Sequence, residues 1–342
     1  MIRAGLIGYG LAGRYFHAPL ITAAGLHLSA VVTSRASEVR ESYPHARVLG
    51  AVTELLADDT IDLVVVASPS RFHFEHAHAA LTARKHVVVD KPIAIASSEA
   101  STLIALAQQQ QRKLSVFQNR RWDGDFLTIR KLIDEDRLGR IAYFRMRWDR
   151  FRPTIADRWR ERAEPGSGML FDLGSHLIDQ ALTLFGPPQW LQADVFGQRE
   201  GSSTDDGFEI LMGKDALRLS LGVSSLAAPG DWRYVIHGSR GSFFKAGLDP
   251  QEDQARAGLS AQDPRFGIES QERHGKLVTG SDGHSEIIAT ERGRWLTYYE
   301  LMKAAIENDG PVPVPAHDAR TVLDVIEAAR RSSATGERIV FR

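Results

Sequence analysis

The stretch IRAGLIGYGLAG, residues 2–13, decides the fold. It opens as a short apolar run that predicts a strand over residues 2–7, and it continues into the glycine pattern G-x-G-x-x-G. A helical pattern over residues 12–24 follows directly. A strand that passes through this pattern into a helix is typical of the first βα unit of a Rossmann domain.

The remainder of the first third repeats this alternation of apolar runs and helical patterns. Near-continuous Val, Ile and Leu strands separated by helices indicate a parallel sheet covered on both faces. We therefore predict an α/β, doubly wound Rossmann domain over residues 1–120. Its further strands are expected at 28–33, 63–67, 86–89 and 114–117, with helices at 53–56, 72–83 and 97–110.

The pattern changes near residue 120, where short alternating runs joined by Gly or Asp turns take over. They predict that residues 121–342 form a C-terminal α+β domain on a large, mostly antiparallel open sheet. The segment 248–292 is polar and rich in Gly and Asp, and we expect long loops there. Strands are expected at 142–148, 191–196, 208–212, 217–223, 232–237 and 242–245 and a helix at 126–135, while helices at 169–185, 294–308 and 316–332 would cover one sheet face.

Composition excludes several classes of protein. The 342 residues are 43% hydrophobic and 25% charged with a formal net charge of −1, so no overall attraction to nucleic acid or membrane is expected. The chain has no cysteine, which excludes disulfides, thiolate nucleophiles and Cys-ligated metal sites. No apolar run has the length of a membrane span, and the N-terminus lacks a signal-peptide layout, so we expect a cytoplasmic protein.

The glycine pattern predicts a dinucleotide site. Gly8 allows the tight turn, Gly10 lets a pyrophosphate approach the backbone, and Gly13 lets the helix sit close to the sheet. With Leu11 and Ala12 between them, these residues are expected to bind the cofactor phosphates at the helix N-terminus. The alternative is a glycine-rich turn that binds no ligand.

The end of the second strand favours NADP over NAD. NAD enzymes usually carry Asp or Glu there, whereas this chain has Ser34 and Arg35 and no carboxylate before Glu38. Ser34 can donate a hydrogen bond to a 2′-phosphate, and Arg35 can pair with it. The alternative is that Arg35 is a solvated loop arginine.

The next strand ends in Ser68, Pro69 and Ser70, at the sheet edge where ligands bind in such folds. We expect these residues to contact the cofactor, although Ser70 could equally cap the following helix. His73 would face the nicotinamide, or it is a satisfied surface histidine.

Two further groups point to acid–base chemistry. Asp90-Lys91-Pro92 ends another parallel strand, so Asp90 and Lys91 lie beside the expected cofactor, and Lys91 can stabilise charge on a substrate oxygen. Asp172 and His176 are four residues apart at a helix start and share one face, and histidine is the usual general base near neutral pH. The alternatives are a solvated lysine, a helix-start carboxylate and a packing histidine. The spacing of the residues indicates no metal site.

A third group interleaves arginine and aromatic residues. Such residues can line a sugar pocket, bind nucleic acid or form an interdomain ion-pair lattice, and the balanced charge argues against nucleic acid. We expect substrate contacts from Asn119, Arg120, Arg121, Trp122, Arg152 and Trp159.

Taken together, these motifs resemble those of the Gfo/Idh/MocA oxidoreductase family over essentially the whole chain. The family pattern joins the Rossmann glycines, a Glu-Lys-Pro tripeptide, here with Asp90 first, and Asp-x-x-x-His on a second-domain helix. Within the family, the chain is particularly similar to bacterial NADP-dependent scyllo-inositol dehydrogenases. That group usually has histidine where this chain has Gln118. The matching stretches are residues 31–35, 114–123, 126–128, 172–180 and 236–238.

The resemblance implies roles and partners. Lys91 and His176 would flank the reacting hydroxyl or carbonyl, Asp172 would orient the site, and hydride would pass directly between substrate and nicotinamide. The second domain would bind a polyol or sugar and would pair subunits through the open face of its sheet, giving a homo-oligomer, dimer or tetramer.

Three functions compete at this point. The first is an oxidoreductase of a cyclitol, most of all scyllo-inositol, or of another sugar such as an aldose or ketose. The second is a non-catalytic NADP-binding regulatory protein, against which the presence of Lys91, Asp172 and His176 argues. The third is a nicotinamide-assisted glycosidase, which would show no net change in NADPH.

Overall fold

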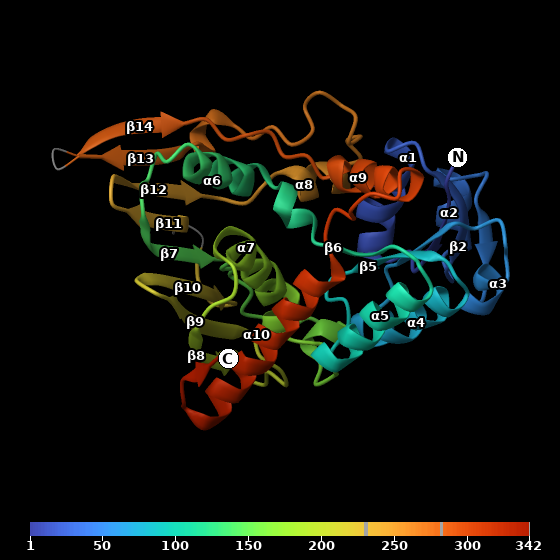
Figure 1. Cartoon of the computed structure of the whole chain (residues 1–342), viewed down its shortest axis with the longest axis horizontal. Coiled ribbons are helices and arrows are strands. Elements are labelled where there is room, and N and C mark those ends of the chain that lie inside the picture. Colours follow the sequence, from blue (N-terminus) through green and yellow to red (C-terminus); the bar gives the residue numbers. More distant parts are fainter. Residues whose placement is uncertain (229–231, 281–282, 342) are drawn as a thin grey trace. The chain divides into compact units, whose positions relative to one another are not determined.

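The computed structural model describes residues 1–228, 232–280 and 283–341, and the chain forms two compact units (Figure 1). The first unit comprises residues 1–122, 250–267 and 294–320, and the second comprises 123–249, 268–293 and 321–342. The first unit thus takes in two segments, 250–267 and 294–320, from the part of the chain that the sequence assigned to the second domain.

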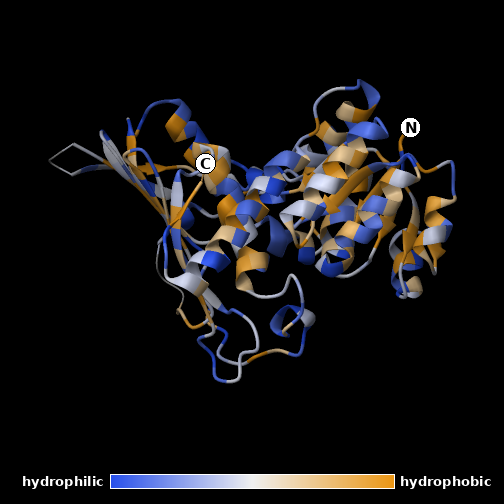
Figure 2. Ribbon diagram, turned by 60° about the horizontal axis from the view of Figure 1, so that its bottom comes forward, coloured by the Kyte–Doolittle hydropathy of each residue, from blue (hydrophilic) through white to orange (hydrophobic). Residues whose placement is uncertain are grey.

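The first unit is built on a six-stranded parallel sheet in the order β3-β2-β1-β4-β5-β6. Its central strands are continuous runs of buried Val, Ile and Leu, as a sheet covered on both faces requires. Figure 2 shows this apolar material along the strands at the centre of the unit. The predicted Rossmann topology is confirmed. The strands are β1 (Arg3–Ile7), β2 (His27–Val32), β3 (Arg47–Leu49), β4 (Leu63–Val66), β5 (His86–Asp90) and β6 (Leu114–Phe117).

Helices cover both faces of this sheet, with α4 and α5 together on one face and α1 and α9 on the other (Figure 1). The helix after the glycine pattern begins as a π-helical turn, η1 (Gly13–His17), before α1 (Ala18–Ala23). The sequence analysis missed α2 and β3, which are short and partly exposed. The other helical segments are α2 (Ala36–Ser42), α3 (Val52–Leu56), η2 (Ser70–Phe72), α4 (His73–Thr82), α5 (Ser97–Gln109), η3 (Asn119–Trp122), α8 (Gln251–Arg256) and α9 (Leu296–Glu307).

The second unit contains a nine-stranded sheet in the order β14-β13-β12-β11-β7-β10-β9-β8-β15. The pairing of β7 with β10 is parallel and the other pairings between its described strands are antiparallel, which confirms the predicted α+β class. The strands are β7 (Ile141–Arg147), β8 (Trp190–Phe196), β9 (Gly207–Lys214), β10 (Leu217–Ser224), β11 (Trp232–Gly238), β12 (Gly241–Ala246), β13 (Gly275–Thr279), β14 (His284–Ile288) and β15 (Ile339–Val340).

The two faces of this sheet differ in exposure because successive side chains alternate. Phe144, Leu219 and Met212 are buried on one face, while the paired row that runs from Leu211 to Ile287 lies on the other. Leu211 and Ile287 at the ends of this row are exposed. The helical segments of this unit are α6 (Gly124–Asp134), η4 (Trp159–Glu161), η5 (Leu170–Gly174), α7 (Ser175–Phe185), η6 (Gln271–Arg273) and α10 (Ala316–Thr335), of which the last begins in the first unit.

The prediction of long loops over 248–292 was wrong in part. The segment holds α8, and it adds the β13–β14 hairpin to the edge of the sheet. Most of β14 is exposed, so it carries the polar residues of an edge strand and none of the apolar alternation that reveals a half-buried strand.

The expectation that a helix over 294–308 covers the second-domain sheet was also wrong. This helix is α9, and its buried aromatic residues pack inside the first unit. Tyr298 donates a hydrogen bond to Ser115 of β6 (2.8 Å) and packs edge-on against Phe117. The sequence revealed the buried face of the helix but not the sheet that it meets.

Candidate active site

The glycine turn after β1 has the geometry of a dinucleotide site. Gly8 adopts a φ of +97°, which favours glycine, and a Cβ added to Gly13 would lie 2.1 Å from the Gly8 carbonyl oxygen. By contrast, a Cβ added to Gly10 would meet no atom within 4 Å. The first and third glycines are therefore required by the fold itself, whereas the second leaves open the backbone approach that a pyrophosphate needs.

The residues after β2 carry charge at the surface. Ser34 is exposed, and the Arg35 side chain is 54% exposed with Nη1 3.6 Å from Oε1 of Glu38. The same Glu38 carboxylate forms an ion pair with Arg14 of η1. The sequence analysis did not single out Arg14, because an arginine one residue beyond the glycine pattern looks like an ordinary helix residue.

His73 joins two loops at the carboxyl edge of the sheet. It is buried, its Nδ1 lies 2.6 Å from the carbonyl oxygen of Pro92, and its Nε2 lies 2.8 Å from that of Ser68. Ser68 Oγ in turn contacts Nδ1 of His76 (3.0 Å), and Ser70 is buried at the start of η2. The contacts of both ring nitrogens with backbone carbonyls agree with a satisfied histidine, but His73 is buried, so the expectation of a surface position was wrong.

Asp90 and Lys91 end β5 beside a buried histidine. The Lys91 backbone N–H donates to Oδ1 of Asp90 (2.9 Å), and Nε2 of His17 lies 3.8 Å from the same oxygen. His17 is fully buried, and its Nδ1 lies 2.6 Å from the hydroxyl of Tyr299. Burial raises the pKa of Asp90, but the hydrogen bond and charge of His17, with the charges of His73 and Lys91, outweigh this and lower it.

His17 and Tyr299 were missed by sequence reasoning. They are 282 residues apart, and only the packing of α9 on the first unit reveals their contact. Together they form a buried polar pair that lies against the Asp90 carboxylate.

The arginines of η3 are engaged within the first unit. Arg120 is buried, forms an ion pair with Glu252, and lies 5.0 Å from the ring centroid of Trp295. Arg121 pairs with Asp318 (3.1 Å). Asn119 is buried, and Trp122 packs edge-on against Tyr298. The ion pairs of Arg120 and Arg121 therefore lie within the first unit and are not the interdomain lattice that the sequence offered as an alternative.

In the second unit, a glycine loop leads into the helix that carries the expected acid–base pair. The Met169 and Leu170 backbone N–H groups donate to Asp205. Gly168 has a φ of +89°, which favours glycine, and a Cβ added there would also overlap the Asp205 carboxylate. Burial raises the pKa of Asp205. Asp172 then lies in η5 with Oδ1 3.3 Å from Nε of Arg160.

His176 follows one turn later, in α7, and is buried. Its ring stacks on Trp148 with centroids 5.9 Å apart and an interplanar angle of 29°. The guanidinium of Arg233 lies over the same indole, 4.5 Å from its centroid, and pairs with Asp125 (3.1 Å). The indole and the helix thus fix the plane of the imidazole. Trp148 and Arg233 have no local sequence signal.

Arg152 and Trp159 lie on the long connection after β7. Arg152 is exposed, and Trp159 is half-buried under the guanidinium of Arg160, 4.5 Å from the ring centroid. Because Arg160 also pairs with Asp172, this arginine joins Trp159 to the expected acid–base helix.

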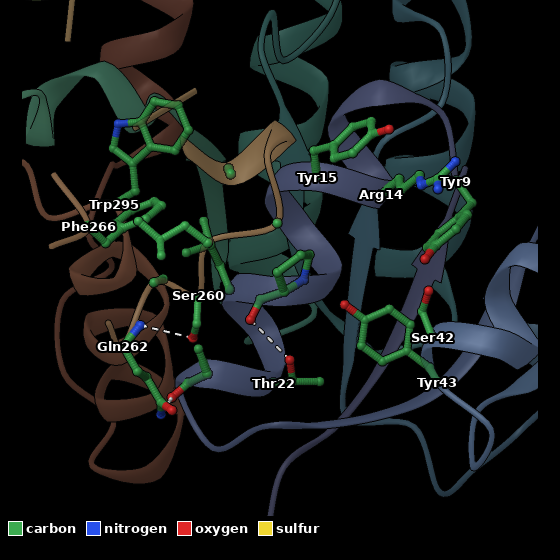
Figure 3. A pocket seen from close by; sticks show the side chains of 17 residues that line it. Tyr9, Arg14, Tyr15, Thr22, Ser42, Tyr43, Ser260, Gln262, Phe266 and Trp295 are labelled. Atoms are coloured by element: carbon green, nitrogen blue, oxygen red, sulfur yellow. Dashed lines mark hydrogen bonds between the residues drawn. The ribbon is translucent and has the colours of Figure 1, made fainter. Parts of the chain in front are cut away.

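The first unit also contains a cavity of about 500 Å³ (Figure 3). Figure 3 shows Tyr9, Arg14, Ser42 and Tyr43 at one end and Trp295 at the other. The three glycines, Ser34 and Arg35 do not line it, whereas Arg14 and Tyr9 do.

In the part of the chain that the structure describes, no three His, Cys, Asp or Glu side chains are grouped so as to hold a metal ion. Among the helices of the same residues, none is both long and apolar enough to cross a membrane.

A Rossmann unit with an open glycine turn, joined to a second unit built on a mostly antiparallel sheet, is an architecture typical of nicotinamide-dependent oxidoreductases. The comparisons with known proteins agree. Residues 2–118 match the oxidoreductase family's NAD-binding Rossmann fold, and residues 130–341 match that family's C-terminal alpha/beta domain. The chain belongs to the Gfo/Idh/MocA oxidoreductase family.

Curated relatives match over nearly full length. The chain is 43% identical to the uncharacterized oxidoreductase YdgJ of Escherichia coli, covering 97% of this chain and 96% of that protein. It is 42% identical to the NADP-dependent scyllo-inositol 2-dehydrogenase IolW of Bacillus subtilis, covering 99% and 96%.

Solved structures are similar throughout the chain. The oxidoreductase yvaA of Bacillus subtilis has a TM-score of 0.97 at 41% identity, covering 100% of this chain and 98% of that one. The oxidoreductase YPO2259 of Yersinia pestis has a TM-score of 0.95 at 40% identity, covering 100% and 97%.

Proposed function

We propose that this protein transfers hydride between NADP and a ring hydroxyl or carbonyl of a cyclitol or sugar, with scyllo-inositol as the first expected substrate. The observation that carries the proposal is the 42% identity, over 99% of the chain, to a dehydrogenase named for that substrate and that cofactor. Ser34 and Arg35 after β2, where an NAD enzyme usually has an acid, support the same cofactor.

The cofactor would lie along the carboxyl edge of the first sheet. The turn from Gly8 to Gly13, with Leu11 and Ala12, would hold the pyrophosphate, and Ser34 and Arg35 the 2′-phosphate. Asp90 ends β5, and the loop after the neighbouring β4 holds Ser68 and Pro69 and leads to Ser70. These residues would border the nicotinamide half. When bound, the nicotinamide accepts or returns the hydride.

The chain's own residues would handle the proton. Oxidation of an alcohol removes the hydroxyl proton as hydride leaves the same carbon, so a base must reach that oxygen. We assign this role to His176, whose plane is fixed by Trp148, and we assign to Lys91 the stabilisation of negative charge on the same oxygen. Asp172, paired with Arg160, would orient the substrate through its hydroxyls.

Substrate contacts are proposed for the residues with available surface. Arg152 and Trp159 have it, and a flat indole suits the face of a sugar ring. We keep the proposed contacts of Trp122, which is partly exposed, and of Asn119, although Asn119 is buried. Arg120 and Arg121 are committed to Glu252 and Asp318, and we assign them to holding η3 in place for those neighbours.

A second candidate is another sugar, an aldose or a ketose. Gln118 favours it, because the inositol dehydrogenases that the sequence resembles usually have histidine there. This glutamine is buried beside Asn119. A change of hydrogen-bonding group at a buried position next to the expected site can alter which hydroxyl pattern is accepted.

We further propose a homo-oligomer formed through the open face of the nine-stranded sheet. Aromatic side chains gather on this face: Tyr143 stacks on His237, and Phe244 contacts both His237 and Trp232. Trp232 is 41% exposed beside these rings, and an exposed apolar patch on a sheet face is typical of a protein–protein interface.

The direct test is a screen for NADP reduction over inositol isomers, aldoses and ketoses. We expect scyllo-inositol to turn over, and NADP to support faster turnover than NAD. If every cyclitol is inert and an aldose reacts well, the second candidate replaces the first.

A further inference from the structure

We infer that Arg14 is a second binding residue for the 2′-phosphate of NADP, beside Arg35. Glu38 neutralises these two arginines when no phosphate is bound, and it thereby reduces the preference of the protein for NADP over NAD. This inference rests on the proposed NADP dependence and names the residues that would set its strength.

The geometry centres on one carboxylate held by two guanidinium groups. Glu38 pairs with Arg14 through Oε2 and lies 3.6 Å from Nη1 of Arg35 through Oε1. Arg14 follows the glycine turn directly, and Arg35 follows β2. Because these two segments border the adenosine ribose in a Rossmann domain, the carboxylate bridges the walls of the expected 2′-phosphate position.

Charge and exposure make this carboxylate displaceable. The side chains of Arg14, Arg35 and Glu38 are 41%, 54% and 31% exposed, and ion pairs at such exposure contribute little to stability. A phosphate monoester brings more negative charge than a carboxylate and three acceptor oxygens, which suit two arginines better. The 2′-phosphate of NADP would therefore replace the Glu38 carboxylate as the partner of both arginines, and the loss of these exposed ion pairs would cost little free energy.

The position of the Arg14 side chain also favours phosphate binding. Its guanidinium lies 5.2 Å from the ring centroid of Tyr15, and Figure 3 shows its side chain extended toward Tyr9. These aromatic neighbours restrict the arginine, so less conformational freedom is lost when it binds a phosphate.

With NAD bound, Glu38 would remain paired with Arg14 and Arg35. Without a 2′-phosphate, Glu38 keeps its arginines and offers a carboxylate near the ribose, as the acidic residue of NAD enzymes does. Glu38 would thus favour NAD and compete with the phosphate of NADP. Both effects reduce the ratio by which the protein binds NADP more tightly than NAD.

The experiment uses cofactor fragments, so it does not depend on turnover. The affinities of 2′,5′-ADP and 5′-AMP for the full chain are measured by titration calorimetry, with thermal unfolding to verify folding. The variants are Arg14→Gln and Glu38→Gln. Arg40→Gln is the matched control, because Arg40 is an exposed arginine of α2, the helix that also carries Glu38.

Arg14→Gln should weaken 2′,5′-ADP by about tenfold and leave 5′-AMP within about twofold, since a charge-assisted contact to phosphate is lost. Glu38→Gln should strengthen 2′,5′-ADP by about two- to fivefold, the scale of one exposed ion pair. Arg40→Gln should change neither.

Two outcomes overturn the inference: Arg14→Gln behaving like Arg40→Gln, or Glu38→Gln weakening 2′,5′-ADP. An Arg35→Ala variant separates this from failure of the NADP proposal. If the wild type prefers 2′,5′-ADP and Arg35→Ala loses that preference while Arg14→Gln keeps it, only the inference fails. If the wild type shows no preference, the proposed cofactor fails as well.

Discussion

At the residue scale, the imidazole of His176 is held by its neighbours before any substrate arrives. Trp148 stacks on it, and Arg233 covers the same indole. A base held in one plane loses less freedom on reaching the transition state than a mobile one. This favours the catalytic interpretation of a residue whose spacing from Asp172 was equally compatible with packing.

The first prediction concerns these catalytic side chains. His176→Ala and Lys91→Ala should each lower turnover about 100-fold or more, the usual scale for acid–base groups. Asp172→Asn should lower turnover less, through orientation. NADPH affinity, measured by fluorescence, should change little for His176→Ala because the glycine turn is intact. A fully active His176→Ala protein would return His176 to a packing role.

A second residue, His86, links pH to stability. Its Nδ1 accepts a hydrogen bond from the Lys113 backbone N–H (3.0 Å), which only the neutral ring can do. Burial, with the nearby charge of Arg112, lowers the pKa of His86 to about 4, below the value of about 6.5 in an unfolded chain. The stabilisation is therefore present above pH 6.5 and is lost as pH falls toward 4.

This can be measured by chemical denaturation at pH 7 and pH 5. His86→Asn keeps an acceptor and removes the titration, so its unfolding free energy should fall by about 2 kcal/mol less than that of the wild type over this interval. His45→Asn, at an exposed position, is the control and should behave like the wild type. An equal fall in His86→Asn would show that His86 does not titrate in this range.

At the element scale, different glycines of the turn after β1 serve the fold and the expected ligand. Gly13 lets η1 approach the carbonyl of Gly8, while Gly10 faces open space. One turn therefore carries a glycine that the fold requires and another that only the ligand requires.

Alanine variants of these two glycines should therefore differ, one in NADPH binding and the other in stability. Gly10→Ala should keep the melting temperature of the wild type and weaken NADPH binding by about tenfold or more, because the new methyl occupies the approach of the pyrophosphate. Gly13→Ala should lower the melting temperature, because its Cβ overlaps the Gly8 carbonyl oxygen. Thermal unfolding and NADPH fluorescence measure the two effects. Unimpaired NADPH binding by Gly10→Ala would place the phosphates elsewhere.

The elements that the sequence predicted well are those with a two-sided or clean one-sided apolar pattern. The Val runs of β4 and β5 and the motif of β1 are of this kind. The sequence did not predict β14, which is exposed at a sheet edge, or the position of α9, whose apolar face fits either sheet by pattern alone. Arg14 and His17 were missed because their partners, Glu38 and Tyr299, lie outside the local motif.

At the scale of the whole molecule, the open sheet face predicts assembly. Light scattering after size exclusion should show more than one copy of the chain. Phe244→Glu should shift the protein toward a monomer, because it puts a charge among Trp232 and His237. Leu301→Glu, at an exposed leucine of α9, should leave the assembly unchanged. A monomeric wild type, or equal behaviour of both variants, would rule out this interface.

The central claim is net hydride transfer to NADP from a ring alcohol. The most direct measurement follows NADPH formed and scyllo-inositol consumed in one reaction of the purified protein, with NAD in parallel. We predict one NADPH for each scyllo-inositol oxidised, and slower reduction of NAD. Product formation without net NADPH, or NADPH binding with no turnover of any cyclitol or sugar, would contradict the account.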